Sequence, residues 1–233
     1  MDLNIEFMKK TFIDVLAGIP VTLQIAFVSL LIATPISFFM SLRRMKNKGI
    51  GNKIIKAYVS LIRGTPIVLQ ILFLYSLLPT TLNYFIKQVL HLDINIFKVN
   101  PILYAYIVFS INTTAVLSEV FRSALSTVNN GQMEAALSTG LSKAQAYIRI
   151  ILPQALVVAL PNICNATVNI LKSTSLAFMM TVQDITAIAK VNAAYGYNYI
   201  EAYLVIFIVY ILLCTIVQML FGATEKAMSV YKV

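Results

Sequence analysis

Two sets of polar positions interrupt the apolar stretches of this sequence at the spacing of an α-helix. Steps of three, four and three residues separate the positions of each set: Asn112, Ala115, Glu119 and Arg122, and then Asn162, Asn165, Asn169 and Lys172. Residues at this spacing lie on one face of a helix. Amide, carboxylate and cationic groups on such a face can form hydrogen bonds and ion pairs with a polar solute or with a neighbouring helix.

Two interpretations of these faces stay open. The amides of Asn112, Asn162 and Asn169 could join helices, a bond typically worth about 0.6 kcal/mol per pair within a membrane, or could contact a ligand. A functional role is favoured for Glu119, because an ionisable group at the centre of a helix in lipid costs roughly 2.5–3.5 kcal/mol on insertion scales. Arg122, three residues further on, could instead neutralise it.

A short island between two long apolar stretches has the features of a separate helix. Residues 134–137 are good helix formers, and Gly140 stands where a left-handed residue would end the helix. Ser142 and Gln145 have the spacing of a capping box that begins the next helix. A short helix between two spans is well placed to contact a soluble partner, although the same pattern also fits an ordinary connection.

The helices that carry these residues are expected to lie in a membrane. The 233 residues are 59% hydrophobic and 12% charged, with a mean hydropathy of +0.83, whereas soluble domains average about 45–50% apolar and about 25% charged. Uncharged runs reach the roughly 20 residues that a helix needs to cross the hydrocarbon core. We predict an all-α, polytopic integral membrane protein with a single domain over residues 1–233. Its five spans are expected at about 15–42, 57–79, 101–125, 150–172 and 200–222, with the short helix at about 130–140.

The distribution of basic residues orients these spans. The formal net charge is +9, and six basic residues lie in the connection between the first two spans: Arg43, Arg44, Lys46, Lys48, Lys53 and Lys56. By the positive-inside rule this connection is cytoplasmic. The N-terminus is then outside, while the 130–140 helix and the C-terminus, with Lys226 and Lys232, are inside. The charge therefore serves orientation, and no nucleic-acid partner is predicted.

Motifs for enzymatic chemistry are missing from the sequence. It has no G-x-x-x-x-G-K-[ST] loop for ATP, no H-E-x-x-H, no G-x-S-x-G and no carboxylate pair placed for acid–base catalysis. His91, the only histidine, has no cluster of metal ligands beside it, and Cys164 and Cys214 fit packing roles in separate apolar runs. We therefore expect no enzyme, no cofactor and no metal. A transport pathway, a channel or a structural membrane subunit remains.

The island resembles the EAA loop in permease subunits of ATP-binding-cassette (ABC) importers. This resemblance rests on Glu134-Ala135-Ala136, Gly140 and Ile150-Ile151-Leu152-Pro153. Further stretches between about residues 18 and 176 resemble the polar amino-acid branch of that family: Gly18-Ile19-Pro20-Val21-Thr22-Leu23, Arg63-Gly64-Thr65-Pro66 with Gln70, Glu119 with Arg122, Gly131-Gln132, Pro153-Gln154-Ala155, Pro161, Asn165 and Lys172-Ser173-Thr174-Ser175-Leu176. The sequence departs from the family at Ser173, where an acidic residue is common, and in its longer external connection, 80–100.

The resemblance implies the type I ABC importer permease fold in a bacterial cytoplasmic membrane, with the 130–140 segment as the coupling helix. The implied partners are cytoplasmic ATPase subunits, an extracellular solute-binding protein, a second permease subunit in a homodimer or heterodimer, membrane lipid and an amino-acid substrate. The implied ATPase-coupling residues are Gly131, Gln132, Glu134, Ala135, Ala136 and Gly140. The implied substrate pathway contains Arg63, Thr65, Asn112, Glu119, Asn165, Lys172 and Ser175.

In that pathway Glu119 would face the ammonium group of the amino acid. Arg63, Lys172 or free backbone N–H groups near a break at Gly64–Pro66 would face its carboxylate, although Arg63 could simply snorkel to the interface. The family branch handles basic and acidic amino acids, glutamine and cystine, and residues 175–185 resemble cystine permeases. The alternative functions are an ATP-independent secondary transporter or channel, which more often shows acidic proton relays or inverted repeats, and a purely structural subunit.

Overall fold

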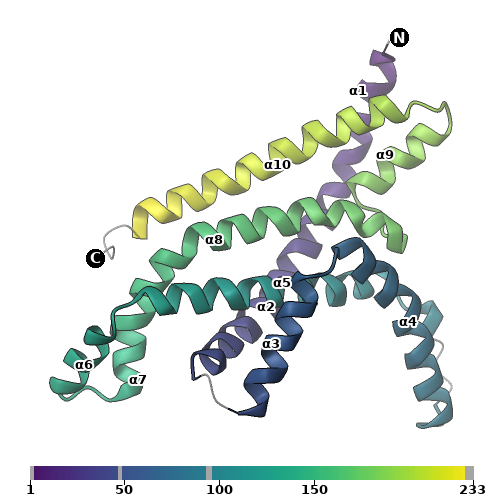
Figure 1. The fold of residues 1–233 in the computed structure, drawn as a ribbon. Coiled ribbons are helices and arrows are strands. Elements are labelled where there is room, and N and C mark those ends of the chain that lie inside the picture. The colour runs from purple at the N-terminus through teal and green to yellow at the C-terminus, as the bar shows by residue number, and fades with distance from the viewer. Residues whose placement is uncertain (1–2, 47–48, 93–95, 229–233) are drawn as a thin grey trace.

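Within the residues that the structure describes, the chain is helical and contains no strand (Figure 1). The structure is a computed structural model that describes residues 3–46, 49–92 and 96–228. Lys48, Lys232 and the C-terminus, which contributed to the predicted orientation, lie outside these ranges. The all-α prediction is confirmed.

In the described ranges, five helical segments are long and apolar enough to cross a membrane, as predicted. The first, Ile5–Met45, joins α1 (Ile5–Val15), the 3-10 turn η1 (Leu16–Gly18) and α2 (Ile19–Met45). The second is α4 (Ile67–Gln88), the third α5 (Pro101–Thr127) and the fifth α10 (Tyr199–Met228). The fourth, Lys143–Met180, joins α7 (Lys143–Ala146), the π-helical η3 (Tyr147–Ile151), α8 (Leu152–Ser173) and the 3-10 helix η4 (Thr174–Met180). The connecting helices are α3 (Ile50–Arg63), η2 (Ile96–Lys98), α6 (Asn130–Ser138) and α9 (Ile185–Ala194).

The second predicted span, 57–79, is wrong as a single helix. The chain forms two helices there, α3 and α4, which meet at Gly64-Thr65-Pro66. Pro66 has no N–H to donate and disfavours a helical conformation in the residue before it, and its own ψ of 135° is extended. The span therefore begins at Ile67. The first span also differs from its prediction, because it begins at Ile5 and includes Lys9 and Lys10.

The predicted external connection 80–100 is largely helix. α4 continues to Gln88, and the hydroxyls of Thr80 and Thr81 donate to the carbonyls of Ser76 and Leu77 one turn back. Threonine can close such local bonds inside a helix, so these polar residues do not end α4. The connection that remains contains η2, and its residues 93–95 lie outside the described ranges.

α5 packs against α2, α8 and α3 near the middle of the molecule (Figure 1). Small, fully buried residues recur every fourth position along α2: Ser29, Ala33, Ser37 and Ser41. Fully buried small residues also occur on α5, at Ala105, Ala115 and Ser118. Small side chains let helix backbones approach closely, which is how membrane helices associate where apolar surface alone gives no driving force. The small residues on both helices therefore explain the extensive α2–α5 contact.

The outer surface carries large apolar side chains. Phe27, Phe39, Phe73 and Phe207, from three of the five spans, are each 64–67% exposed. Soluble monomers rarely expose large apolar patches. This exposure fits helices whose outer faces contact lipid.

A close backbone contact joins the first span to the start of α9. Gly18 is buried, and a Cβ atom there would lie 2.5 Å from the backbone nitrogen of Ile185 and 2.7 Å from the carbonyl carbon of Asp184. No side chain fits in that space. Only glycine therefore fits where the backbone of Asp184 and Ile185 approaches the first span. This close packing explains the glycine of the Gly18-Ile19-Pro20 motif.

Asp184 begins α9 from a fully buried position outside the five spans. Its Oδ1 accepts a hydrogen bond from the backbone N–H of Ala187 at 2.8 Å, and the hydroxyl of Tyr210 donates to its Oδ2 at 3.5 Å. Burial raises the pKa of Asp184 from 3.8 to about 6, although hydrogen bonds from Ala187 and Thr186 oppose this rise. Burial in the folded state thus destabilises the charged carboxylate of Asp184 relative to the neutral carboxylic acid.

Replacing Asp184 by asparagine is expected to stabilise the protein at neutral pH. Because the folded pKa lies above the unfolded one, the wild type loses stability as the pH rises from about 4 to about 6. Asparagine keeps an acceptor for the Ala187 N–H without a charge, so D184N should gain roughly 1–3 kcal/mol above that range and little below it. Thermal unfolding of the detergent-solubilised proteins at several pH values measures the difference. A difference that does not change with pH would contradict the assignment.

Candidate functional site

The end of α6 is closed by two backbone hydrogen bonds. The N–H of Gly140 donates to the carbonyl of Leu137 (3.0 Å), and the N–H of Leu141 donates to the carbonyl of Ala136 (3.2 Å). This pair of bonds is the Schellman motif. Gly140 has the left-handed conformation that the motif requires, with a φ of +85°. The predicted role of Gly140 in ending the helix is confirmed.

Side-chain caps begin both α6 and the helix that follows it. Asn129 Oδ1 accepts a hydrogen bond from the N–H of Gly131 at 2.8 Å. Ser142 Oγ accepts from the N–H of Gln145 at 3.3 Å, and Gln145 Oε1 accepts from the N–H of Ser142 at 2.9 Å, which is the predicted capping box. α6 and α7 form a tip beyond the ends of α5 and α8 (Figure 1).

One face of α6 packs inward and the other is exposed. Ala136 is buried, Met133 packs on the apolar cluster between α5 and α8, and Gln132 is half-buried. The exposed residues of this helix include Gly131, Glu134, Ala135 and Leu137. In the described part of the chain, Glu134 takes part in no salt bridge. α6 therefore presents a carboxylate near an exposed leucine, on a rigid, capped helix.

The break between α3 and α4 is held by one buried glutamine. Gln70 Nε2 donates to the carbonyls of Ile62 (2.8 Å) and Thr65 (3.0 Å) and lies 2.9 Å from Thr65 Oγ1. Gln70 Oε1 accepts from Asn112 Nδ2 at 2.9 Å. The carbonyls at the break thus have a partner, as backbone groups within a membrane require, and α5 is tied to the break. Arg63 and Thr65 themselves are exposed.

The polar faces of spans three and four meet at one small cavity. Asn112 from α5 and Asn169 and Ser173 from α8 line a space of about 60 Å³. Asn169 belonged to the predicted polar face but not to the predicted pathway, and Ser173 entered only as a departure from the family pattern. Their meeting depends on how α5 and α8 are rotated against each other, which sequence spacing alone does not define.

The polar face of α8 continues onto the surface of the chain. Asn162, Asn165, Asn169 and Lys172 are all exposed, within a segment that is long and apolar enough to cross the membrane. Ser175, in η4, is half-buried and donates its hydroxyl to the carbonyl of Lys172 at 2.7 Å. Amides and an ammonium group within a span are costly against lipid. This face therefore needs protein or water beside it.

Glu119 is held between two arginines. Arg44 Nη1 donates to Oε2 at 2.6 Å, and Arg122 Nε donates to Oε1 at 3.0 Å, with a second contact from its Nη2. Both carboxylate oxygens are therefore engaged in this conformation. Pairing with Arg122 was one of the two sequence interpretations, whereas the role of Arg44, from the first span, was missed. The expected contact of Glu119 with a substrate ammonium gains no support from this geometry.

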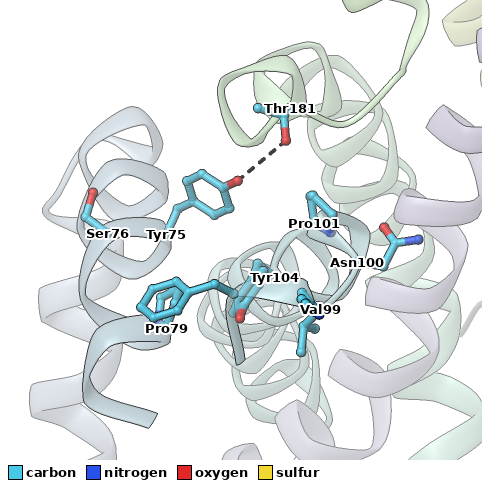
Figure 2. A pocket seen from close by; sticks show the side chains of 10 residues that line it. Tyr75, Ser76, Pro79, Val99, Asn100, Pro101, Tyr104 and Thr181 are labelled. Carbon is cyan, nitrogen blue, oxygen red and sulfur yellow. Dashed lines mark hydrogen bonds between the residues drawn. The ribbon is translucent and has the colours of Figure 1, made fainter. Parts of the chain in front are cut away.

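A larger cavity, of about 700 Å³, lies between α4, the segment before and into α5, and the turn after η4 (Figure 2). The hydroxyl of Tyr75 points toward Thr181 Oγ1 at 3.5 Å, and its ring lies edge-on to that of Tyr104, with centroids 5.8 Å apart. Lys98 contributes a positive charge to the lining. This cavity was not predicted from the sequence, because its residues come from three separate segments without a shared periodicity.

The part of the chain that the structure describes has five helices long and apolar enough to span a membrane, polar groups that meet between two of them, and a capped helix at one end. This arrangement is that of a multi-pass membrane transport subunit. Residues 33–230 match the family described as the inner membrane component of binding-protein-dependent transport systems. The match covers most of the chain, and the chain belongs to this family. It is a permease subunit of the ABC importer class, and the family implies ATPase partners.

Two similar permease proteins match nearly the whole chain. It is 35% identical to the L-cystine transport system permease protein TcyL of Bacillus subtilis (strain 168), over 90% of this chain and 85% of TcyL. It is 34% identical to YckA, a probable amino-acid ABC transporter permease protein of the same bacterium, over 98% of this chain and 95% of YckA. A crystal structure of an amino acid ABC transporter with histidines has a similar fold, with a TM-score of 0.78 and 25% identity over 97% of this chain and 100% of that one. The predicted type I permease fold is confirmed.

Proposed function

We propose that an amino acid enters the cell along this permease, driven by ATP hydrolysis on separate ATPase subunits. The observation that carries the proposal is the exposed polar face of α8, from Asn162 to Lys172, within a membrane span. Such a face is stable where it borders a water-filled path or another subunit, and unstable against lipid. A polar path is what a transport subunit needs and what a structural subunit does not. Family membership favours an ATP-driven importer over an ATP-independent transporter or channel.

A second permease subunit would supply the wall that α8 lacks. Association of two permease chains, identical or related, would cover the exposed amides of Asn162, Asn165 and Asn169 and enclose the path between the subunits. Arg63 and Thr65 are also exposed, so residues at the α3–α4 break remain available to the same path. Dimerisation thus accounts for polar exposure that a single chain leaves unexplained.

The substrate path fits a zwitterion. An amino acid carries a carboxylate, which the ammonium group of Lys172 and the guanidinium of Arg63 can attract. Its ammonium group can donate hydrogen bonds to amide oxygens such as those of Asn165 and Asn169. We propose that Glu119 acts chiefly through its pairing with Arg44 and Arg122. Cystine is one candidate substrate because TcyL is named for L-cystine transport.

The basic residues orient the chain in a bacterial cytoplasmic membrane. Arg43, Arg44, Lys53 and Lys56 lie at the junction of α2 and α3, which the positive-inside rule puts in the cytoplasm. The N-terminus is then outside, and the C-terminus and α6 are inside, where α6 can receive ATPase subunits. The 700 Å³ cavity near Tyr75 and Thr181 is then at the outer side, where a solute-binding protein would deliver the substrate.

The N165L variant tests the proposed path. Leucine makes the middle of the exposed α8 face apolar, so the complex should assemble with its ATPase subunits while uptake falls by about tenfold or more, the cost of one lost polar contact. Uptake of radiolabelled amino acid into proteoliposomes measures this. Val158→Leu, a change at an exposed apolar position of α8, is the matched control and should leave uptake unchanged. Equal uptake in both variants would contradict a path along this face.

A further inference from the structure

An apolar groove that shares no residue with the polar face of α8 runs between α2, α3 and α5. Its volume is about 520 Å³ and its lining is almost entirely apolar, including Ile36, Met40, Ile54, Tyr58 and Ile107. Ile36 and Ile54 are 47% and 64% exposed, so the groove opens at the surface of the chain. Tyr58 donates its hydroxyl to the carbonyl of Ile111 at 2.6 Å, which leaves an apolar ring as its contribution to the wall.

A basic cavity adjoins the groove. It measures about 370 Å³ and is lined by Arg44, Met45, Lys56, Arg122 and Ser126. The residues of the two spaces are neighbours along the helices, since Arg44 follows Met40 by one turn of α2 and Lys56 follows Ile55 on α3. The apolar groove therefore ends at a cluster of cations.

The two arginines of this cavity keep a positive charge after their ion pairs with Glu119 are counted. Arg44 and Arg122 contribute two positive charges, and Glu119, which pairs with both, contributes one negative charge, which leaves a net charge of +1 on the three groups. The side chain of Arg122 is 36% exposed, so its guanidinium is accessible to an anion in the cavity.

We propose that this groove and cavity together bind one anionic phospholipid, with its phosphate at Arg44 and Arg122 and an acyl chain along Ile36 and Met40. Basic pockets between membrane helices at the cytoplasmic side are suited to acidic lipid headgroups, and a narrow apolar groove on the outside of a bundle suits a hydrocarbon chain. The charge at one end selects the occupant, because neither a zwitterionic lipid nor an apolar helix would compensate the cations. The site lies outside the proposed substrate path and does not depend on the identity of the transported solute.

Tryptophan fluorescence can test the site directly, because the chain contains no tryptophan. Ile36→Trp puts a fluorophore in the groove about 12 Å along α2 from Arg44, near the middle of an acyl chain whose phosphate contacts Arg44. The full chain is reconstituted in vesicles with phosphatidylglycerol or phosphatidylcholine brominated at mid-chain. Brominated phosphatidylglycerol should quench the tryptophan at about fivefold lower mole fraction than brominated phosphatidylcholine, given about 1 kcal/mol for the one net charge of the arginine pair.

Matched variants separate this site from bulk lipid. Phe39→Trp, at an exposed position of the same helix outside the groove, should be quenched equally by both lipids. In the Ile36→Trp background, Arg122→Gln should remove the preference, while Arg43→Gln, which changes a neighbouring exposed arginine, should keep it. Equal quenching by both lipids at Ile36→Trp would overturn the proposal. If neither lipid quenches the tryptophan, protein such as a second copy of the chain covers the groove, and the proposal is wrong. If inorganic phosphate at matched ionic strength removes the preference, the cavity is a site for a free anion and not for a lipid.

Discussion

Reversing the charge of Glu134 should detach this permease from its ATPase subunits. Glu134 is exposed on α6, and no described residue forms a salt bridge with it, so its carboxylate is available to a partner. A like charge set against a complementary interface costs several kcal/mol, and we expect E134K to weaken ATPase binding by about 100-fold or more. Titration of the purified ATPase onto the detergent-solubilised permease measures the affinity.

The fold of α6 should survive this substitution. Lysine and glutamate have similar helix propensities, and the Schellman motif at Gly140 uses only backbone groups. Glu225→Lys, the same charge reversal at an exposed position near the end of α10, is the matched control and should leave ATPase affinity within about twofold. If E134K binds the ATPase as tightly as this control, α6 is not the coupling helix.

Replacing Gly18 by alanine should be the most damaging single-methyl change for the fold. Its Cβ would lie 2.5 Å and 2.7 Å from backbone atoms of Ile185 and Asp184, so backbone must move to relieve the overlap. Overpacking of this kind costs typically 1–3 kcal/mol and sometimes more, and we expect G18A to lose at least about 3 kcal/mol because no flexible side chain can yield. The thermal unfolding midpoint and the folded yield of the detergent-solubilised protein report this loss.

A second glycine-to-alanine change provides the comparison. Gly51 lies in α3, and a Cβ atom added there would meet no neighbouring atom within 4 Å. Alanine is favoured over glycine inside a helix by about 0.5–1 kcal/mol. G51A should therefore match or slightly exceed the wild type in stability. Equal midpoints for G18A and G51A would contradict the close contact between the first span and α9.

Local features of this fold were predictable from the sequence. The number of spans follows from uncharged runs, the end of α6 from Gly140, and the start of α7 from the spacing of Ser142 and Gln145. Each depends on residues within one or two turns of each other. A break at Gly64–Pro66 was expected from the proline, but not that the second span would begin only after it, because Pro35 and Pro161 show that membrane helices can also continue through proline.

Contacts between distant segments were not predictable. Gln70 meets Asn112 across 42 positions, and Arg44 meets Glu119 across 75. Both depend on the rotation of helices about their own axes, which hydrophobic periodicity specifies poorly when most of each helix is apolar. The partner of Glu119 was therefore sought within its own helix at Arg122, and the first span was overlooked.

ATP-driven uptake tests the central claim most directly. Proteoliposomes would contain this permease with its ATPase subunits, with the solute-binding protein and radiolabelled amino acid outside and either ATP or a non-hydrolysable analogue inside. Accumulation of the amino acid against its gradient is expected only with ATP and with the binding protein present. Accumulation at the same rate with the analogue, or by this chain alone, would contradict an ATP-driven importer.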